Sequence, residues 1–258
     1  MLGKLLKHEW IATARKYGLF YLVLAAMTVF AAVLHAVPVE LTIFRIVETI
    51  FLGLYVITLI AVMVCSFGMA VIRFYQNMVS DEGYLTFTLP VKVEALMATK
   101  VLVGLFWQVI TVFLLLGSVF CVYVLGHVEV STFFGKLADS FNGSGITLVM
   151  VAVLLLVSVM YQLMLCYFSV SVGQSFQGNK IVGAVVTYVA VDFGIKTIMM
   201  VVFFAVVAVV GIPGLEKAVG LGQGMTVVMT CITGWILLLV IAGYLGSCYF
   251  LKKKLNLN

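Results

Sequence analysis

The sequence predicts an all-α integral membrane protein, and three observations lead to this fold class. Hydrophobic residues make up 64% of the 258 residues and charged residues only 10%, whereas a soluble domain averages roughly 45–50% and about 25%. Mean hydropathy is +1.26. The apolar residues form long runs that are apolar all round, as membrane helices require, without the alternation of barrel strands. We expect one membrane domain, residues 1–258, without a cleavable signal segment.

The first predicted element is an amphipathic helix from Leu2 to Ala14. At about 100° per residue, one side carries Leu2, Leu5, Leu6 and Trp10, and the other side carries Lys4, Lys7 and His8. We expect this helix to lie in the inner membrane interface, with its basic side toward anionic lipid. Glu9 falls on the apolar side. We expect it to snorkel or to pair with Arg15 or Lys16, and contact with a partner protein is the alternative.

Six membrane spans are predicted next, each near the length of about twenty residues that a bilayer requires. The spans are Tyr17–Val37, Ile46–Ile72, Leu102–Gly126, Ile146–Gly173, Ile181–Gly211 and Met225–Leu251. A short helix, residues 132–142, is predicted on the outer interface, and whether it gates a substrate stays open. The last span also carries two pairs of small residues, Ala242 with Gly246 and Gly243 with Ser247, which predict close helix packing within the chain or at a dimer face.

The distribution of lysine and arginine predicts the orientation. If both termini are cytoplasmic, the inner segments hold eleven basic residues: Lys4, Lys7, Arg15, Lys16, Arg73, Lys92, Lys100, Lys180, Lys252, Lys253 and Lys254. The outer loops then hold only Arg45, Lys136 and Lys217. Cytoplasmic segments carry the excess of basic residues, so we expect both termini and the loop between spans two and three to be cytoplasmic. The net charge of +5 therefore reflects topology and does not indicate nucleic-acid binding.

The loop between spans two and three is the longest interior segment that is both polar and patterned. Ser80 is suited to cap a short helix, and carboxylates at Asp81 and Glu82 suit its first turn. Pro90 would end that helix, and a second helix is expected to restart near Glu94. A short helix held between two spans is suited to transmitting force to or from another protein. The alternative is a loop helix that rests on the bilayer, with Tyr84, Leu85 and Phe87 in lipid.

Asp192 and Lys196 are ionisable residues within the fifth span, four apart and therefore on one helix face. An ionisable residue inside a membrane is costly and marks a candidate functional site. Three roles remain open for the pair: a structural ion pair, a contact with substrate or a partner, and a proton relay.

Several chemistries find no motif in the sequence. The five cysteines and three histidines do not fall at metal-ligand spacing, and no hydrolase motif occurs. No phosphate-binding GxxxxGK[ST] loop occurs either, so a second chain would have to bind any ATP that this protein uses. We expect a transport subunit without catalytic residues or cofactors of its own.

The segment Arg73-Phe-Tyr-Gln-Asn-Met-Val-Ser-Asp-Glu-Gly-Tyr-Leu-Thr-Phe-Thr-Leu-Pro-Val, followed by Lys100, resembles permease subunits of type 2 ABC exporters, most closely those of Gram-positive bacteria. The N-terminal Leu-Gly-Lys-Leu-Leu-Lys-His-Glu-Trp is similar to the opening helix of that family, and the six-span topology also matches. The resemblance does not extend to Asp192 or Lys196, since no family motif is known there.

The resemblance implies a multi-pass protein of the bacterial cell membrane, in which two permease copies, identical or related, each dock a separate ATPase that binds ATP and Mg. The loop would be a coupling helix, with contacts from Ser80, Asp81, Glu82, Gly83, Tyr84, Leu85, Thr86, Phe87, Thr88, Leu89 and Pro90. Leu2 to Trp10 would form an interfacial elbow.

The expected function is ATP-driven export of an amphipathic substrate, such as an antimicrobial peptide, a drug or a lipid. Export of a peptide would give resistance to it. Two alternatives stay open. One is a secondary transporter driven by an ion gradient through Asp192 and Lys196, and the other is a non-transporting membrane protein that confers immunity by binding a peptide.

Overall fold

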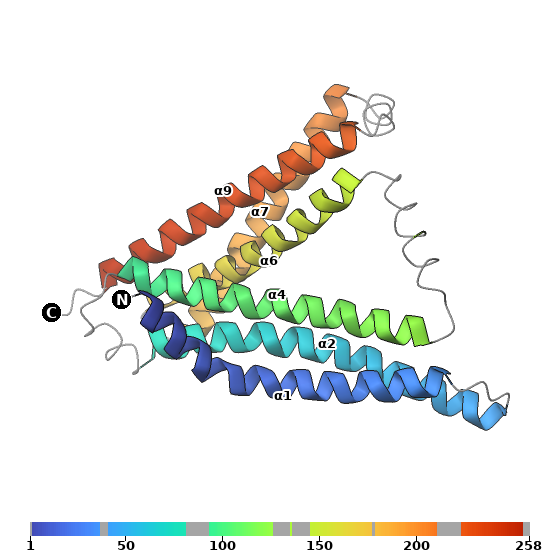
Figure 1. The fold of residues 1–258 in the computed structure, drawn as a ribbon. Helices are drawn as coiled ribbons and strands as arrows, with labels where there is room; N and C mark the ends of the chain where they lie inside the picture. Colours follow the sequence, from blue (N-terminus) through green and yellow to red (C-terminus); the bar gives the residue numbers. More distant parts are fainter. Residues whose placement is uncertain are drawn as a thin grey trace. The chain divides into compact units, whose positions relative to one another are not determined.

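The computed structural model describes residues 2–36, 41–80, 93–125, 135, 145–176, 179–210 and 223–254. Within these residues the regular structure is helical and no strand occurs. The helices in chain order are α1 (Leu2–Ala36), α2 (Thr42–Met78), α4 (Val93–Leu125), α6 (Gly145–Gly173), α7 (Lys180–Val210) and α9 (Gln223–Lys254) (Figure 1).

Each of these six helices is long and apolar enough to cross a membrane. The shortest has 29 residues and the longest 37, which at about 1.5 Å per residue gives lengths of roughly 43–55 Å. A bilayer's hydrocarbon core is about 30 Å thick, so the helices either tilt or continue beyond it. The all-helical class and the six predicted spans are confirmed at this level.

Several helix boundaries differ from the predicted spans, since α2 begins at Thr42, before Ile46, and α4 begins at Val93, before Leu102. The predicted N-terminal helix and the first span form one uninterrupted helix, α1, because Arg15 and Lys16 are good helix formers and do not break it. The second helix continues six residues past Ile72, to Met78. The restart near Glu94 is confirmed, since α4 begins at Val93. The predicted coupling residues 81–90 lie outside the described residues, as does the predicted outer helix 132–142 apart from Gly135.

The chain divides into two compact units, which are treated separately below. Unit 1 comprises Met1–Ile72 and Ala98–Asp139, and unit 2 comprises Arg73–Met97 and Ser140–Asn258. The ends of α2 and α4 that flank the loop therefore belong to unit 2, while most of both helices belongs to unit 1.

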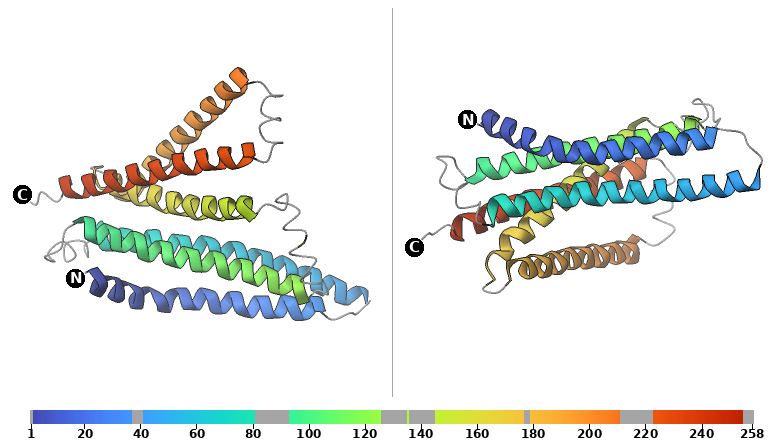
Figure 2. Two further views of the ribbon diagram at one scale, coloured as in Figure 1. Left: turned by 45° about the horizontal axis from the view of Figure 1, so that its top comes forward. Right: turned by 90° about the horizontal axis from the view of Figure 1, so that it is seen from below.

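Unit 1 is held together by hydrogen bonds between its spans. The α1 and α4 helices run alongside each other (Figure 2), and their side chains meet in the order Thr13 with Trp107, Tyr21 with Thr111 and Thr28 with Ser118. The sequence numbers rise together, so the two helices run in the same direction. On α2, Ser66 pairs with Tyr17, and Tyr55 reaches Ser118 beside Thr28, so α2 runs the opposite way. Polar bonds of this kind join helices in lipid, where apolar surface gives no driving force.

Unit 2 is organised around α6, which packs along both α7 and α9. A methyl group added at Gly246 of α9 would lie 2.7 Å from the Phe168 ring of α6. Ser247 is fully buried. Gly246 and Ser247 of the last span therefore pack within the chain, whereas Ala242 is exposed. Gly173, the last residue of α6, lies close to the first turns of α7. A methyl group added at Gly173 would lie 2.7 Å from the backbone nitrogen of Ala184.

Candidate functional site

Ser80 is the one residue of the predicted coupling segment 80–90 that the structure describes, together with the helix ends on either side of the segment. The N–H group of Ser80 donates to the carbonyl oxygen of Tyr75 at 3.1 Å, and its hydroxyl donates to the carbonyl of Gln76. Ser80 thus lies in the turn that follows the end of α2, and whether it also caps a following helix lies outside the described residues.

The end of α2 is anchored to α6 by an aromatic stack and a hydrogen bond. The rings of Phe74 and Tyr167 stack with centroids 4.1 Å apart, and both side chains are buried. Just past the end of α6, the Gln174 amide donates to the carbonyl oxygen of Met78 at 3.3 Å. The last turn of α2 therefore has a defined position against α6.

The start of α4 is anchored to α9 at the other end of the loop. The Tyr244 hydroxyl donates to the carbonyl oxygen of Glu94 at 3.0 Å. The Glu94 carboxylate forms an ion pair with the ammonium group of Lys252. Both charged side chains are about half exposed, so water screens this pair and it contributes little to stability.

These anchors bring both ends of the loop to one end of unit 2. Residues expected on the same side of the membrane, at the ends of α2, α6 and α9 and the start of α4, meet there. The contacts agree with spans that alternate in direction.

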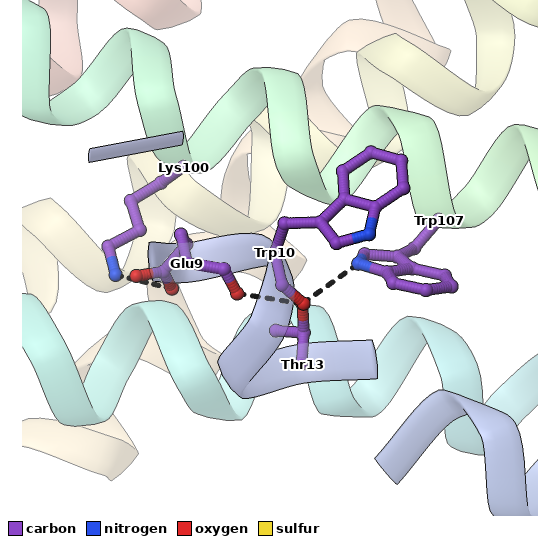
Figure 3. Close-up of polar contacts among 5 residues, drawn as sticks. All are labelled: Glu9, Trp10, Thr13, Lys100 and Trp107. Atoms are coloured by element: carbon purple, nitrogen blue, oxygen red, sulfur yellow. Dashed lines mark hydrogen bonds and ion pairs between the residues drawn. The ribbon is translucent and has the colours of Figure 1, made fainter. Parts of the chain in front are cut away.

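A second polar cluster lies in unit 1, where the N-terminal part of α1 meets α4 (Figure 3). The Lys100 ammonium and a Glu9 carboxylate oxygen are 2.6 Å apart, and the two side chains are only 9% and 15% exposed. One turn further along α1, the Thr13 hydroxyl accepts a hydrogen bond from the Trp107 indole at 2.9 Å. The same hydroxyl donates to the backbone carbonyl of Glu9. The Trp107 ring stacks on Tyr17 with centroids 4.7 Å apart.

Two of the four predicted elbow residues contact α4. Leu6 packs against the cluster of Tyr17, Val103 and Trp107. The Trp10 ring lies over Phe106, with centroids 3.9 Å apart. Leu5 is partly buried, and the structure describes only the backbone of Leu2. The apolar side of this segment therefore has a protein neighbour, and Glu9 lies on that side because Lys100 is there.

The third candidate is the charged pair on α7. The Lys196 ammonium lies 2.6 Å from a carboxylate oxygen of Asp192, and Lys196 is 73% exposed while Asp192 is 16% exposed. The other carboxylate oxygen, Oδ1, is buried and makes no hydrogen bond to any described group. One turn earlier, the Tyr188 hydroxyl accepts a hydrogen bond from Gln162 of α6. A cavity of about 160 Å³ lies between α6, α7 and α9.

Sequence reasoning placed Asp192 and Lys196 on one helix face and gave an ion pair as one possible role, and the structure shows that pair. It did not predict the partners in the other two clusters. Glu94 and Lys252 are 158 residues apart, and no local spacing links such a pair. The sequence did contain a signal for the pairing of Glu9 with Lys100. The two residues carry opposite charges, and both lie near the cytoplasmic end expected for their spans. Within the described ranges, no three histidine, cysteine or acidic side chains gather as a metal site would need.

Comparison of the chain with protein-family models, with curated proteins and with solved structures found no match.

Proposed function

We propose that this chain is the membrane-spanning subunit of an ATP-driven exporter of the type 2 ABC class. The observation that carries the proposal is the anchoring of both ends of segment 81–92: Phe74 and Met78 to α6 and its end, and Glu94 to α9. A segment that another protein pushes can do work only if its ends are fixed to the helices that must move. The resemblance of Asp81–Pro90 to the coupling segments of that class supports the same function.

In the proposed mechanism, an ATPase subunit grips the segment through its acidic and aromatic side chains. Asp81 offers a charge and Tyr84 and Phe87 offer aromatic anchors, and aromatic anchors tend to dominate interface energy. ATP binding and hydrolysis on that subunit displace the segment. The anchors then transmit the displacement to α6 and α9, and the spans alternate between inward-facing and outward-facing states. The substrate is amphipathic, and the chain itself performs no chemistry.

The proposal is tested by affinity capture of the chain from its native membrane, together with transport measured in ATP-depleted cells. We expect capture of a protein with a phosphate-binding GxxxxGK[ST] loop and loss of transport when ATP is depleted. Capture without such a protein, together with transport that persists without ATP, would reject the proposal.

The second subunit in the proposal is another copy of this chain, placed against α7. Lys196 lies about 24 Å from the start of α7 and about 21 Å from its end, at 1.5 Å per residue, and is therefore near mid-membrane if α7 crosses the bilayer. An exposed ammonium group at that depth is poorly tolerated by lipid. It lies on an apolar stripe with alternating spacings of four and three residues: Val182, Val186, Val189, Phe193, Lys196, Met200 and Phe203.

Two copies joined along this stripe would remove the Lys196 charges from lipid and place each beside the partner's Asp192–Lys196 pair. Cysteine at Phe193, in a variant without the native cysteines, is expected to form a disulfide-linked dimer in membranes. Cysteine at Ile57, another exposed apolar residue, on α2, serves as the control. Equal cross-linking at both positions would argue against a specific interface on α7.

A secondary transporter is the second candidate function, and the buried Oδ1 atom of Asp192 favours it. A buried carboxylate oxygen without a hydrogen bond calls for an explanation, and uptake of a proton or cation during transport would supply one. This function predicts that Asp192→Asn abolishes transport while Tyr84→Ala leaves it unchanged. The exporter predicts loss of transport in Tyr84→Ala.

A further inference from the structure

The N-terminal end of α1 and the first turns of α4 are joined by contacts that the transport proposal does not use. Figure 3 shows Glu9 and Lys100 pointing toward each other, with Thr13 between Glu9 and Trp107. Glu9 and Thr13 are one turn apart on α1, while Lys100 and Trp107 are two turns apart on α4. Contacts at two levels fix both the rotation and the height of one helix against the other.

The ion pair is the part of this contact whose loss has the largest effect. Both side chains are mostly buried, so neither charge is well solvated once its partner is removed. A buried ion pair adds little compared with an apolar contact, but removal of one partner is strongly destabilising because it leaves an uncompensated charge. The pair therefore holds the segment in one position and makes partial opening unfavourable.

Apart from Glu9, the N-terminal segment of α1 is also suited to a second position, on the surface of the membrane. Lys7 and His8 are exposed on the side away from α4, and a helix with one basic side and one apolar side binds the surface of an anionic bilayer. Glu9 lies in the middle of the apolar side, where it would oppose membrane binding. Its position is explained by Lys100, so the sequence favours the docked position over the lipid surface.

We infer that residues 2–13 form a latch: the Glu9–Lys100 ion pair holds this segment closed on α4, and loss of the pair releases it toward the membrane surface. While the latch is closed, the first turns of α4, which follow the loop directly, cannot rotate or slide without separating two buried charges. The latch is thus a conformational device at the loop end of unit 1. It does not depend on whether the chain works with an ATPase.

The test is hydrogen–deuterium exchange of the full chain in lipid nanodiscs, read from peptides covering residues 5–13. Residues 2–13 are the N-terminal end of α1, and a helix end without its packing partner frays readily. We expect Glu9→Gln and Lys100→Met each to raise exchange there by at least about 100-fold, the factor for an unpaired buried charge. The charge exchange Glu9→Lys with Lys100→Glu restores slow exchange. Lys16→Met removes an exposed charge of the same helix and leaves exchange unchanged.

Peptides from α2 up to Ile72 report whether unit 1 is folded, and peptides from α6 and α9 report the same for unit 2. If the single variants exchange as slowly as the native chain, or if the charge-exchanged variant exchanges as fast as the single variants, the latch is overturned. If both single variants unfold throughout the chain, the variant with Glu9→Lys and Lys100→Glu together tests the latch. A folded, slowly exchanging chain supports the latch, and an unfolded one overturns it. A cysteine pair at Leu6 and Val103, in a chain without its native cysteines, gives an independent reading through lower cross-linking in Lys100→Met.

Discussion

In unit 1, single hydroxyl and indole groups form hydrogen bonds that join one span to another. Thr13 is 3% exposed and Trp107 is 7% exposed, and the indole N–H of Trp107 finds its acceptor in the Thr13 hydroxyl. The same hydroxyl donates to its own helix, so both of its hydrogen-bonding functions are used.

Thr13→Val tests this contact because valine keeps the shape of threonine and lacks the hydroxyl. The variant leaves the buried indole N–H of Trp107 without this acceptor, and an unsatisfied buried donor costs about 1–3 kcal/mol. We expect resistance to denaturation in mixed detergent micelles to fall by this amount. Thr58→Val, which removes an exposed hydroxyl that bonds only its own helix at Leu54, is expected to stay close to the native value. Equal losses in both variants would contradict the role assigned to Thr13.

At the scale of elements, the close approach of α6 and α7 is set by a residue without a side chain. Gly173 ends α6 where the backbone of Ala184 lies within reach of a single added carbon. A backbone atom cannot rotate aside as a flexible side chain can. The two helices would have to separate for any larger residue.

Gly173→Ala is therefore expected to destabilise unit 2 by about 1–3 kcal/mol, the usual effect of overpacking. Gly194→Ala is the matched control, because the added carbon would meet no atom within 4 Å. Alanine is also the better helix former, by roughly 1 kcal/mol. Thermal unfolding of the two variants should thus shift in opposite directions, and a Gly173→Ala variant as stable as the native chain would show that the approach is looser than described.

The sequence was sufficient for the elements and insufficient for their partners. Hydropathy predicted six spans because a bilayer imposes one length and one composition on any helix that crosses it. It wrongly separated an N-terminal helix from the first span at Arg15 and Lys16. Charged residues mark the edge of the apolar run, but the helix can continue through them. The contacts of Glu9 with Lys100 and of Glu94 with Lys252 depend on which helices become neighbours, and no spacing along the chain encodes that.

At the scale of the whole molecule, the proposal requires that movement of the loop reach the spans through the anchors on α6 and α9. The charge of Lys252 and the carboxylate of Glu94 can each be removed with little change in volume, as Lys252→Met and Glu94→Gln. Both variants should still bind the ATPase, because segment 81–92 is unchanged, yet they should transport less substrate per ATP hydrolysed. Lys180→Met, which removes an exposed charge at the start of α7, should keep the native ratio in reconstituted vesicles.

If the ratio of transport to hydrolysis were unchanged in both anchor variants, force would have to pass by another route. If ATPase binding itself were lost, Glu94 and Lys252 would belong to the docking surface and would not act as anchors. Either outcome would revise the mechanism without removing the proposed transport function.

The central claim is that the loop between α2 and α4 is gripped in the cytoplasm by an ATPase that is a separate chain. Its most direct test is a photo-cross-linking amino acid placed at Tyr84 in living cells, with the cross-linked partner identified by mass spectrometry. The account predicts a cross-link to a protein that carries a phosphate-binding GxxxxGK[ST] loop. Adducts with lipid alone, or labelling of residue 84 by a membrane-impermeant reagent added outside the cell, would contradict it.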